Sequence, residues 1–349
     1  MNRFLHFAAV LLLIGILAAV GCENGTGGGA SPQEQAELHD FEPVTEIKDG
    51  QKNIYVVLKV MTSQYWQDII RGITDAGKEL NCNVYIGGPS GEGDWESQKK
   101  LLDKAVNELG ADAIIISPAS SSALIDDLSE IHDSGLPVIL VDTTINGSGY
   151  DACYMTDNLR AGELAAKEMV DALLESGVSP DENAGIAIQI TSVSSQTIID
   201  RLAGFNQYWA VNAPSGWVVL DEVKTNNGNK ERAKQNCVDF LADYPDIKGF
   251  FGCNNSSTVG FVEGVTEAGR KDIVLVGFDY ADETAALVAD DEYRASTVVQ
   301  NQYDMGYDGL KNAVGILDGD ENEYKFIDTG VVVINKSNYK EYEAGVDKK

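Results

Sequence analysis

Residues 53–88 read NIYVVLKVMTSQYWQDIIRGITDAGKELNCNVYIGG, and this stretch decides the fold class. Its opening run, NIYVVLKV, is typical of a strand that is buried on both faces of a parallel sheet. Residues 66–80 then place Ile69 and Ile73 at helical spacing on one side. Because a further apolar run, NVYIGG, follows, the stretch predicts the strand–helix–strand unit of an α/β protein.

The same unit repeats along the rest of the chain. Four strand–helix units end near residue 142, and a second series of alternating helices and strands begins at residue 158. Two such series predict two Rossmann-like lobes with parallel sheets and right-handed crossovers. The further predicted strands are 83–88, 111–118, 135–142, 185–190, 217–223, 247–253, 273–279, 295–300 and 324–334. The predicted helices are 66–80, 95–110, 121–133, 158–176, 198–209, 230–244, 258–269, 283–290 and 303–317.

Polar and aromatic side chains follow several of these strands. In open parallel sheets the ligand binds beyond the carboxyl ends of the strands, so we expect a site in the cleft between the lobes. Carboxylates can accept pairs of hydroxyls, Arg and Asn can donate to others, and aromatic rings can cover the apolar face of a sugar. The candidate ligand-binding residues are Lys59, Tyr65, Trp66, Ser117, Asp142, Thr143, Arg201, Asn254, Asp279 and Gln300.

Each candidate also has an ordinary structural explanation. Asp142 and Asp279 could cap the helices that follow them. Arg201 could form an ion pair at the surface, and Tyr65 and Trp66 could belong to the core. The pattern as a whole favours a site for a hydroxyl-rich ligand more strongly than any single residue does.

The composition excludes several classes of function. The 349 residues are 44% hydrophobic, enough for a sizeable core, and carry a formal net charge of -29. A surface this acidic repels a phosphate backbone, so we expect no nucleic-acid partner. Of the three histidines, only His132 falls in the part predicted to fold, which leaves little material for a histidine-based catalytic or metal site. We expect no enzyme, no cofactor and no metal.

The first 21 residues combine Arg3, an apolar run and small residues before Cys22, a pattern that predicts a signal peptide. The apolar run is short for a membrane span. The ending AAVGC resembles a bacterial lipobox, which implies cleavage before Cys22 and diacylation of its sulfur. Residues 22–51 are rich in Gly, Ser and acids and are predicted to be a flexible tether.

Four further cysteines, Cys82, Cys153, Cys237 and Cys253, show no CxxC spacing, so a zinc or redox motif is not supported. Disulfides are possible in an exported protein, but a domain of this size does not need them. We expect these residues to be buried free thiols.

Eight segments stand in a recognisable order and spacing. They are VVLKVMTSQYW, ADAIIISPASSSAL, GLPVILVD, YMTDN, IDRLAGF, FFGCNN, IVLVGFD and STVVQNQYDMGYDGLKNAV. Over about residues 53–338, the chain resembles the ribose-type periplasmic sugar-binding proteins of ABC importers. The resemblance implies two lobes that are joined by three crossovers and close on a ligand.

The resemblance also implies roles and boundaries. Tyr65 and Trp66 stand where the family stacks aromatic rings on the sugar. The polar contacts at matching positions are Asp142, Arg201, Asn254, Asp279 and Gln300. The expected lobes are residues 52–155 with 301–328 and residues 156–300 with 329–342, followed by a tail at 343–349.

Several positions depart from the ribose-binding pattern. Thr143 follows Asp142 where ribose binders have Arg, and Ser63 stands where they have Asn. Gly228 falls near the place of an expected aromatic residue. Lys59 resembles a subgroup that includes binders of autoinducer-2. Ribose itself is therefore doubtful, and pentoses, hexoses, polyols and autoinducer-2-like furanosyl compounds all stay open.

The predicted function is an extracytoplasmic receptor that captures a sugar and delivers it to the permease and ATPase of an ABC importer. We expect a monomer that contacts the membrane only through its lipid anchor. A sensory receptor with the same fold is the alternative. An enzyme is disfavoured because the Gly91–Gly93 pair lacks the third glycine of a dinucleotide loop. A sugar-responsive transcription regulator is disfavoured because a leader and tether stand where its DNA-binding domain would be.

Overall fold

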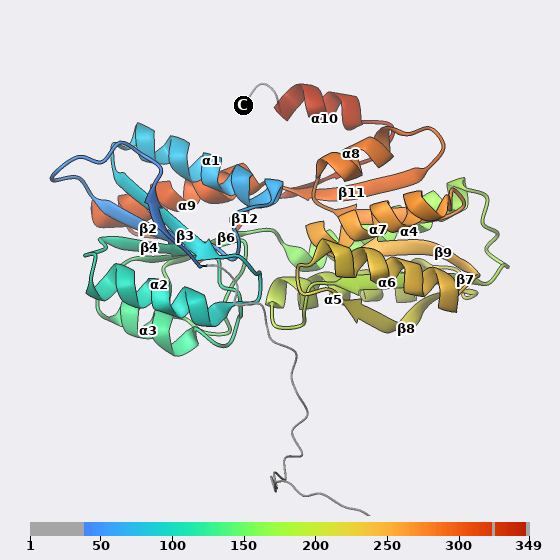
Figure 1. The fold of residues 1–349 in the computed structure, drawn as a ribbon, viewed down its shortest axis with the longest axis horizontal. Coiled ribbons are helices and arrows are strands. Elements are labelled where there is room, and N and C mark those ends of the chain that lie inside the picture. The colour runs from blue at the N-terminus through green and yellow to red at the C-terminus, as the bar shows by residue number, and fades with distance from the viewer. Residues whose placement is uncertain (1–37, 323–324, 347–349) are drawn as a thin grey trace, which may run out of the picture. The chain divides into compact units, whose positions relative to one another are not determined.

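The structure, a computed structural model, describes residues 38–322 and 325–346. Over these ranges the chain folds into two sheets of mostly parallel strands that are flanked by helices (Figure 1). Each sheet is the centre of one lobe. The predicted two-lobed α/β fold is confirmed.

The N-terminal lobe holds a sheet that, among the described residues, has seven strands in the order β1-β3-β2-β4-β5-β6-β12. Neighbouring strands are parallel except β1, which runs antiparallel to β3. The strands are β1 Leu38–Pro43, β2 Asn53–Val57, β3 Asn83–Pro89, β4 Ala113–Ile116, β5 Val138–Val141, β6 Ala152–Met155 and β12 Phe326–Asp328.

Helices cover both faces of this sheet because side chains alternate along each strand. On β2, Ile54 and Val56 join the cluster formed with α1 and α9, whereas Tyr55 and Val57 join the cluster formed with α2 and α3. Every residue of this alternation is apolar, as expected for a strand with no solvent-facing side. The helices are α1 Gln64–Glu79, α2 Trp95–Asn107, α3 Ile125–Asp133 and α9 Gln302–Leu317.

The C-terminal lobe repeats this plan. Its sheet has six strands among the described residues, in the order β13-β11-β10-β9-β7-β8, and only β13 is antiparallel to its neighbour. The strands are β7 Ala184–Ile190, β8 Trp217–Thr225, β9 Ile247–Gly252, β10 Val274–Phe278, β11 Arg294–Gln300 and β13 Val331–Ile334.

The second sheet is also packed on both faces. Phe205 and Phe251 stack in the cluster that faces α4 and α5, and Phe250 and Phe261 stack in the cluster that faces α6 and α7. The helices of this lobe are α4 Asn158–Glu175, α5 Gln196–Asn212, α6 Lys230–Asp243, α7 Asn255–Ala268, α8 Asp282–Ala289 and α10 Tyr339–Val346.

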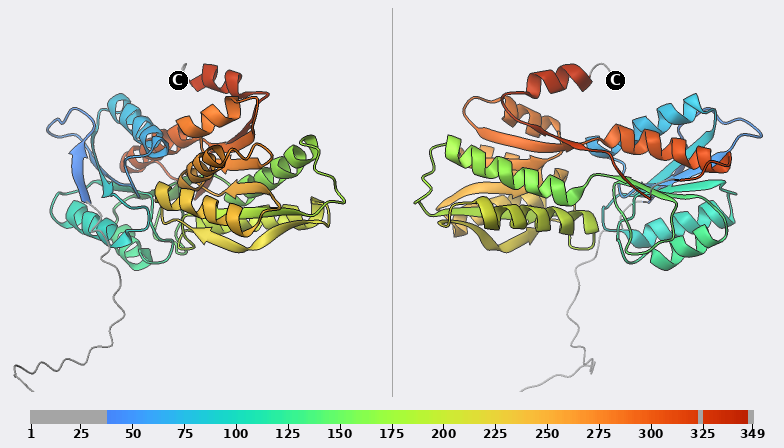
Figure 2. Two further views of the ribbon diagram at one scale, coloured as in Figure 1. Left: turned by 45° about the vertical axis from the view of Figure 1, so that its right-hand side comes forward. Right: turned by 180° about the vertical axis from the view of Figure 1, so that it is seen from behind.

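The chain passes between the sheets after β6, after β11 and after β12, since β6 and β12 belong to the first sheet and β7, β11 and β13 to the second. These segments can be followed in Figure 2. The crossovers place Thr156 and Gln300 at the junction of the lobes.

The prediction of a flexible tether over residues 22–51 is wrong for its last part. Leu38–Pro43 forms β1, an edge strand that pairs with β3, and the Phe41 ring packs edge-on against Tyr55 at 4.9 Å. The strand is polar because most of its side chains are exposed, so it lacks the apolar period of a buried strand. Residues 22–37 lie outside the described ranges.

The prediction of a tail from residue 343 is also wrong. Residues 339–346 form α10, which lies beside α8 at the end of the C-terminal lobe (Figure 1). Tyr339 and Tyr342 pack against Val288, Val299 and Ile334. The helix is short and largely exposed, so its apolar content gave no clear periodicity.

Two further expectations concern cysteines and the membrane. Cys82, Cys153, Cys237 and Cys253 are buried free thiols, as predicted. Among residues 38–322 and 325–346, no helix is long and apolar enough to cross a bilayer.

Candidate functional site

The carboxyl ends of adjacent strands gather the candidate side chains. Lys59, Ser117 and Asp142 lie one or two residues beyond β2, β4 and β5, which are neighbours in the first sheet. In the second sheet, Asp279 follows β10 directly and Gln300 ends the adjacent β11. The edge predicted to carry the ligand site therefore holds buried polar groups in both lobes.

Two aspartates occupy equivalent places in the lobes. Asp142 follows the fourth parallel strand of the first sheet, and Asp279 follows the fourth parallel strand of the second. Both have left-handed backbones, with φ of 65° and 69°. Non-glycine residues adopt this conformation at a cost in energy, and such residues concentrate at functional sites. Neither aspartate is the N-cap of a helix, so the capping explanation does not hold for them.

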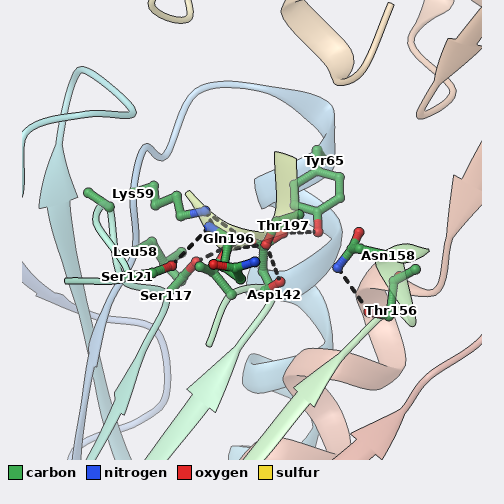
Figure 3. A network of polar contacts seen from close by, with 12 residues as sticks. Leu58, Lys59, Tyr65, Ser117, Ser121, Asp142, Thr156, Asn158, Gln196 and Thr197 are labelled. Carbon is green, nitrogen blue, oxygen red and sulfur yellow. Dashed lines mark hydrogen bonds and ion pairs between the residues drawn. The ribbon is translucent and has the colours of Figure 1, made fainter. Parts of the chain in front are cut away.

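The Asp142 carboxylate receives four hydrogen bonds from side chains of its own lobe (Figure 3). Tyr65 Oη donates to Oδ1 at 2.5 Å, and Lys59 Nζ donates to Oδ2 at 2.9 Å. Thr143 Oγ1 and Ser117 Oγ donate to the same Oδ2 at 2.7 and 3.1 Å. These four donors match the acceptor capacity of a carboxylate.

The electrostatics of this group follow from its partners. Burial alone would raise the pKa of Asp142, but the Lys59 charge and the hydrogen bonds outweigh burial and lower it to about 2. The Tyr65 pKa lies well above its ordinary value because of burial and then the charges of Asp142 and Asp279. The pair of Lys59 and Asp142 is therefore an internal ion pair at neutral pH.

Asp279 lies in a different environment. Its Oδ1 accepts one side-chain hydrogen bond, from Gln300 Nε2 at 2.9 Å, and the residue is 4% exposed. The Asp279 pKa is raised to about 6, because burial outweighs the Arg201 charge and the Gln300 hydrogen bond, which lower it. Gln300 Oε1 is buried without a hydrogen-bond partner in the part of the chain that the structure describes.

Arg201 is held in place by its own lobe. Its Nε donates to Asn158 Oδ1 at 2.8 Å, and one terminal nitrogen donates to the Cys253 carbonyl at 2.7 Å. The guanidinium lies 4.0 Å from the centroid of the Phe278 ring. Arg201 is 2% exposed, so the surface ion-pair explanation is wrong for this residue.

Asn254 has a local structural role. It is the N-cap of α7, and its Oδ1 accepts hydrogen bonds from the Ser257 backbone and hydroxyl. The amide nitrogen donates to Ser256 Oγ at 3.0 Å. Most of its bonding capacity is thus used within α7.

Tyr65 and Trp66 belong to the core of the N-terminal lobe, as the structural explanation expected, although Tyr65 also contacts Asp142. Their rings meet edge-on at 5.0 Å. Trp66 is 2% exposed, and its indole N–H makes no hydrogen bond of normal geometry among residues 38–322 and 325–346. It lies close enough to the Glu92 carboxyl to lower the pKa of that acid.

The two lobes touch beside this group. Thr143 Oγ1 lies 3.0 Å from Thr197 Oγ1, at the start of α5. Nearby, the Gln196 backbone N–H donates to Ser121 Oγ at 3.0 Å, and the Ser121 N–H donates to the Ser194 carbonyl at 3.2 Å. Figure 3 shows Thr197 and Gln196 reaching the N-terminal lobe residues. The lobes are therefore in contact along one side of the cleft.

The sequence did not identify Thr197, Asn158 or Glu92. Glu92 lies in the glycine-rich loop after β3, and its side chain lies against Gly228 of the other lobe. Burial raises the Glu92 pKa, and the Lys59 charge offsets part of that effect. Glu92 could have been identified from the sequence, because it is an acidic residue that lies just beyond the carboxyl end of a predicted strand. No comparable signal marked Thr197.

No group of three or more His, Cys, Asp and Glu side chains with metal-binding geometry occurs in the described residues.

The family model of the periplasmic binding protein domain matches residues 54–321, more than half of the chain. The chain belongs to this family. Its members are extracytoplasmic solute-binding receptors, and the family's two-lobed architecture matches the fold described above.

Two curated relatives show the extent of the similarity. The D-allose-binding periplasmic protein of Escherichia coli is 27% identical over 264 residues, which cover 73% of this chain and 81% of that protein. The ribose import binding protein of Bacillus subtilis is 23% identical over 313 residues, which cover 89% of this chain and 93% of that protein.

Two solved structures of solute-binding proteins are also similar. The carbohydrate transporter protein of Agrobacterium radiobacter, in complex with D-arabinose, matches with a TM-score of 0.80 and 27% identity over 86% of this chain and 99% of its own. The ABC transporter protein of Agrobacterium vitis with bound D-fucose has a TM-score of 0.77 and 30% identity over 84% of this chain and 98% of its own.

Proposed function

We propose that this protein binds a sugar outside the cytoplasm and delivers it to an ABC importer. The observation that carries the proposal is the meeting of polar groups from both lobes around Tyr65. Its hydroxyl bonds to Asp142 of its own lobe, and its side chain lines a hollow together with Asp279 of the other lobe. The relatives named for allose and ribose, and the structures with arabinose and fucose, support a sugar as the ligand.

The groups with bonding capacity left suit a sugar. Asp279 and Gln300 Oε1 offer acceptors, and the Trp66 indole N–H offers a donor. Each sugar hydroxyl can donate one hydrogen bond and accept others, so it can satisfy groups of both kinds. Buried groups without partners are costly, and a ligand that pairs with them gains affinity and specificity.

The ten candidate ligand-binding residues fall into two sets. We propose direct ligand contacts for Tyr65, Trp66, Asp279 and Gln300. We propose that the other six position the site or approach the ligand through their remaining donors. These six are Lys59, Ser117, Asp142, Thr143, Arg201 and Asn254.

Closure on the ligand follows from the two-lobed arrangement. A ligand that contacts both lobes stabilises the closed form by its differential affinity for that form. The closed form would then dock on the permease. The contacts of Thr143 with Thr197 and of Ser121 with Gln196 would form in that state.

We also propose that Cys22 carries a lipid that holds the protein at the outer face of the plasma membrane. Cys22 lies outside the described residues. The pattern of residues 1–22 supports this proposal. Metabolic labelling with an alkyne-tagged fatty acid should mark the wild-type protein and leave a Cys22→Ser variant unlabelled.

A thermal-shift screen of the mature chain, followed by titration calorimetry, tests sugar binding. The panel contains D-ribose, D-allose, D-arabinose, D-fucose, polyols and autoinducer-2. A ligand that binds only the folded state raises the melting temperature. Asp279→Ala should weaken binding of any positive sugar at least about 100-fold, the cost of about 3 kcal/mol.

The matched control is Asp171→Ala, which removes an acid from the exposed face of α4. It should leave the dissociation constant unchanged. Binding of no sugar by the wild-type protein, or equal binding by the Asp279→Ala variant, would contradict the proposal.

A further inference from the structure

A hollow of about 410 Å³ lies at the proposed ligand contacts, because Tyr65 and Asp279 both line it. Its volume falls within about 300–1,000 Å³, the usual range of small-molecule pockets. The N-terminal lobe contributes α1 to its wall, and the C-terminal lobe contributes α10 and the residues after β10. The chemistry of this lining therefore bears directly on which sugar the proposed site would take.

Acids outnumber bases in the lining of this hollow. The acidic lining residues are Asp68, Asp279, Asp282 and Glu343, and the basic one is Arg71. Arg71 forms an ion pair with Asp68 at 3.3 Å, one turn away on α1, so its charge is already matched. The other three acids are left without a basic partner among the lining residues.

The acidic composition of the chain, in which 55 acids outnumber 26 bases, does not account for Asp279. Acids at an exposed surface keep their water, but Asp279 is 4% exposed. Its pKa is raised to about 6 because burial outweighs the Arg201 charge and the Gln300 hydrogen bond. A carboxylate in this state is stabilised by a further cation that binds beside it.

The unpaired polar atom beside Asp279 is a hydrogen-bond acceptor. Gln300 Nε2 donates to Asp279 Oδ1 at 2.9 Å, whereas Gln300 Oε1 has no partner among residues 38–322 and 325–346. Gln300 is 5% exposed, so water reaches this oxygen poorly. Tyr65 Oη, which could otherwise donate to a ligand, already donates to Asp142. The ligand group that completes this corner must therefore be a donor.

A protonated amine meets these requirements better than a hydroxyl group does. An ammonium group has three N–H donors and no acceptor, whereas a hydroxyl has one donor. A hydrogen bond from an ionised donor to a carboxylate is about twice as strong as one between neutral groups. An ammonium group can therefore donate to Asp279 and to Gln300 Oε1 together, while its charge offsets the excess of acid. A uronate or phosphate group would be repelled.

We propose that the ligand is an amino sugar, a sugar with a protonated amine in place of one hydroxyl, and that Asp279 and Gln300 accept hydrogen bonds from this amine. Asp282 and Glu343 add to the negative field that attracts the cation. The aromatic side chains of the same lining can cover the C–H face of the ring. This inference rests on the proposed sugar-binding function and narrows its ligand class.

Titration calorimetry on the mature chain near neutral pH compares each amino sugar with the parent sugar that has a hydroxyl in the same place. The pairs are D-glucosamine and 6-amino-6-deoxy-D-glucose with D-glucose, D-galactosamine with D-galactose, and D-mannosamine with D-mannose. At least one amino sugar should bind about tenfold more tightly than its parent, because a hydrogen bond to a charged group replaces one between less polar partners.

Asp279→Asn tests the proposed acceptor. Asn has nearly the same shape, tolerates the left-handed backbone and carries no charge. The variant should lose the roughly tenfold preference for the amino sugar over its parent. An equal loss of affinity for both sugars would overturn the selective role of Asp279.

Glu343→Gln and Glu341→Gln form a matched pair on α10. Each removes one charge from an exposed glutamate, so neither should prevent folding, but of the two only Glu343 lines the hollow. Glu343→Gln should weaken amino-sugar binding about two- to threefold, the effect of an exposed charge. Glu341→Gln should leave it unchanged. Equal effects of the two substitutions would overturn the contribution of the lining charge.

The results of the calorimetry separate this inference from the proposed function. Parent sugars that bind as tightly as their amino forms would overturn the amino-sugar ligand and leave sugar binding in place. Binding of no sugar of either kind would overturn both. D-galacturonate carries the opposite charge and should not bind, and tight binding of it would overturn the inference alone.

Discussion

Asp142 and Asp279 occupy equivalent positions in the two lobes, with the same left-handed backbone, but have opposite electrostatic environments. The pKa of Asp142 is lowered to about 2, and that of Asp279 is raised to about 6. Asp142 has the Lys59 ammonium at 2.9 Å and three hydroxyl donors, whereas Asp279 has one side-chain amide. The first carboxylate is satisfied by the protein, and the second keeps bonding capacity for a ligand.

Lys59→Met tests the internal ion pair. Removal of the ammonium leaves the Asp142 carboxylate buried with hydroxyl partners alone, and its pKa should rise. We expect the free energy of unfolding to fall by about 3–5 kcal/mol near neutral pH. Urea denaturation measures this loss.

The double variant Lys59→Met/Asp142→Asn is the control for this interpretation. Asn tolerates the left-handed backbone and carries no charge, so the double variant should be more stable than Lys59→Met. If the two variants are equally unstable, the loss comes from packing of the Lys59 stem and not from the unpaired charge.

Asp279→Asn tests the raised pKa. The unfolded carboxyl ionises near 3.8, and the folded one near 6. Between these values the folded state binds more protons than the unfolded state, so this group makes the protein less stable as pH rises from about 4 to about 7. The shift corresponds to about 3 kcal/mol.

The variant should therefore match the wild-type protein near pH 4 and exceed its unfolding free energy by up to about 3 kcal/mol near pH 8. Urea denaturation without ligand across this range measures the difference. A difference that does not change with pH would show that Asp279 titrates at its ordinary pKa.

Gly162→Ala tests the contact of α4 with α5 that positions Arg201. A Cβ atom at Gly162 would lie 2.1 Å from the Arg201 carbonyl oxygen, so the helices must separate. We expect a loss of about 1–3 kcal/mol in unfolding free energy and weaker sugar binding, because Arg201 shifts.

Gly345→Ala is the matched control, also in a helix, and a Cβ atom there meets nothing within 4 Å. It should be neutral or stabilise by about 0.5–1 kcal/mol. Thermal denaturation of both variants measures the contrast. Equal stability of the two would mean that α4 and α5 adjust without strain.

Thr197→Val tests the contact between the lobes. It removes the hydroxyl that lies 3.0 Å from Thr143 and keeps the shape of the side chain. One hydrogen bond contributes about 0.5–1.5 kcal/mol, so we expect sugar affinity to fall about two- to tenfold through a less favoured closed state. Calorimetry measures the affinity, and small-angle scattering measures closure.

Thr284→Val is a suitable comparison because its buried hydroxyl has no hydrogen-bond partner in the described part of the chain. This change should leave sugar affinity unaltered. If Thr197→Val also binds normally, the threonine contact does not contribute to closure.

The sequence predicted that several candidate side chains gather at one edge of the first sheet, because they directly follow its strands. Lys59, Ser117, Asp142 and Thr143 are far apart in the chain, but parallel strands bring their carboxyl ends to one edge, and the structure places the four in one network. The ligand roles of these residues stay predictions. The partners of Asp142 were not predictable, because hydrogen bonds within a lobe depend on side-chain positions.

The sequence by itself determined the two-lobed α/β fold. The spacing of apolar residues along a strand or helix shows which of its sides are buried, and this spacing can be seen in the sequence alone. Only the tertiary structure decided that Leu38–Pro43 is a strand, that α10 reaches the cleft and that Thr197 meets Thr143. Edge strands, short surface helices and contacts between lobes depend on partners distant in sequence. Such contacts leave no local pattern, because their energy comes from the meeting of two surfaces and not from either one alone.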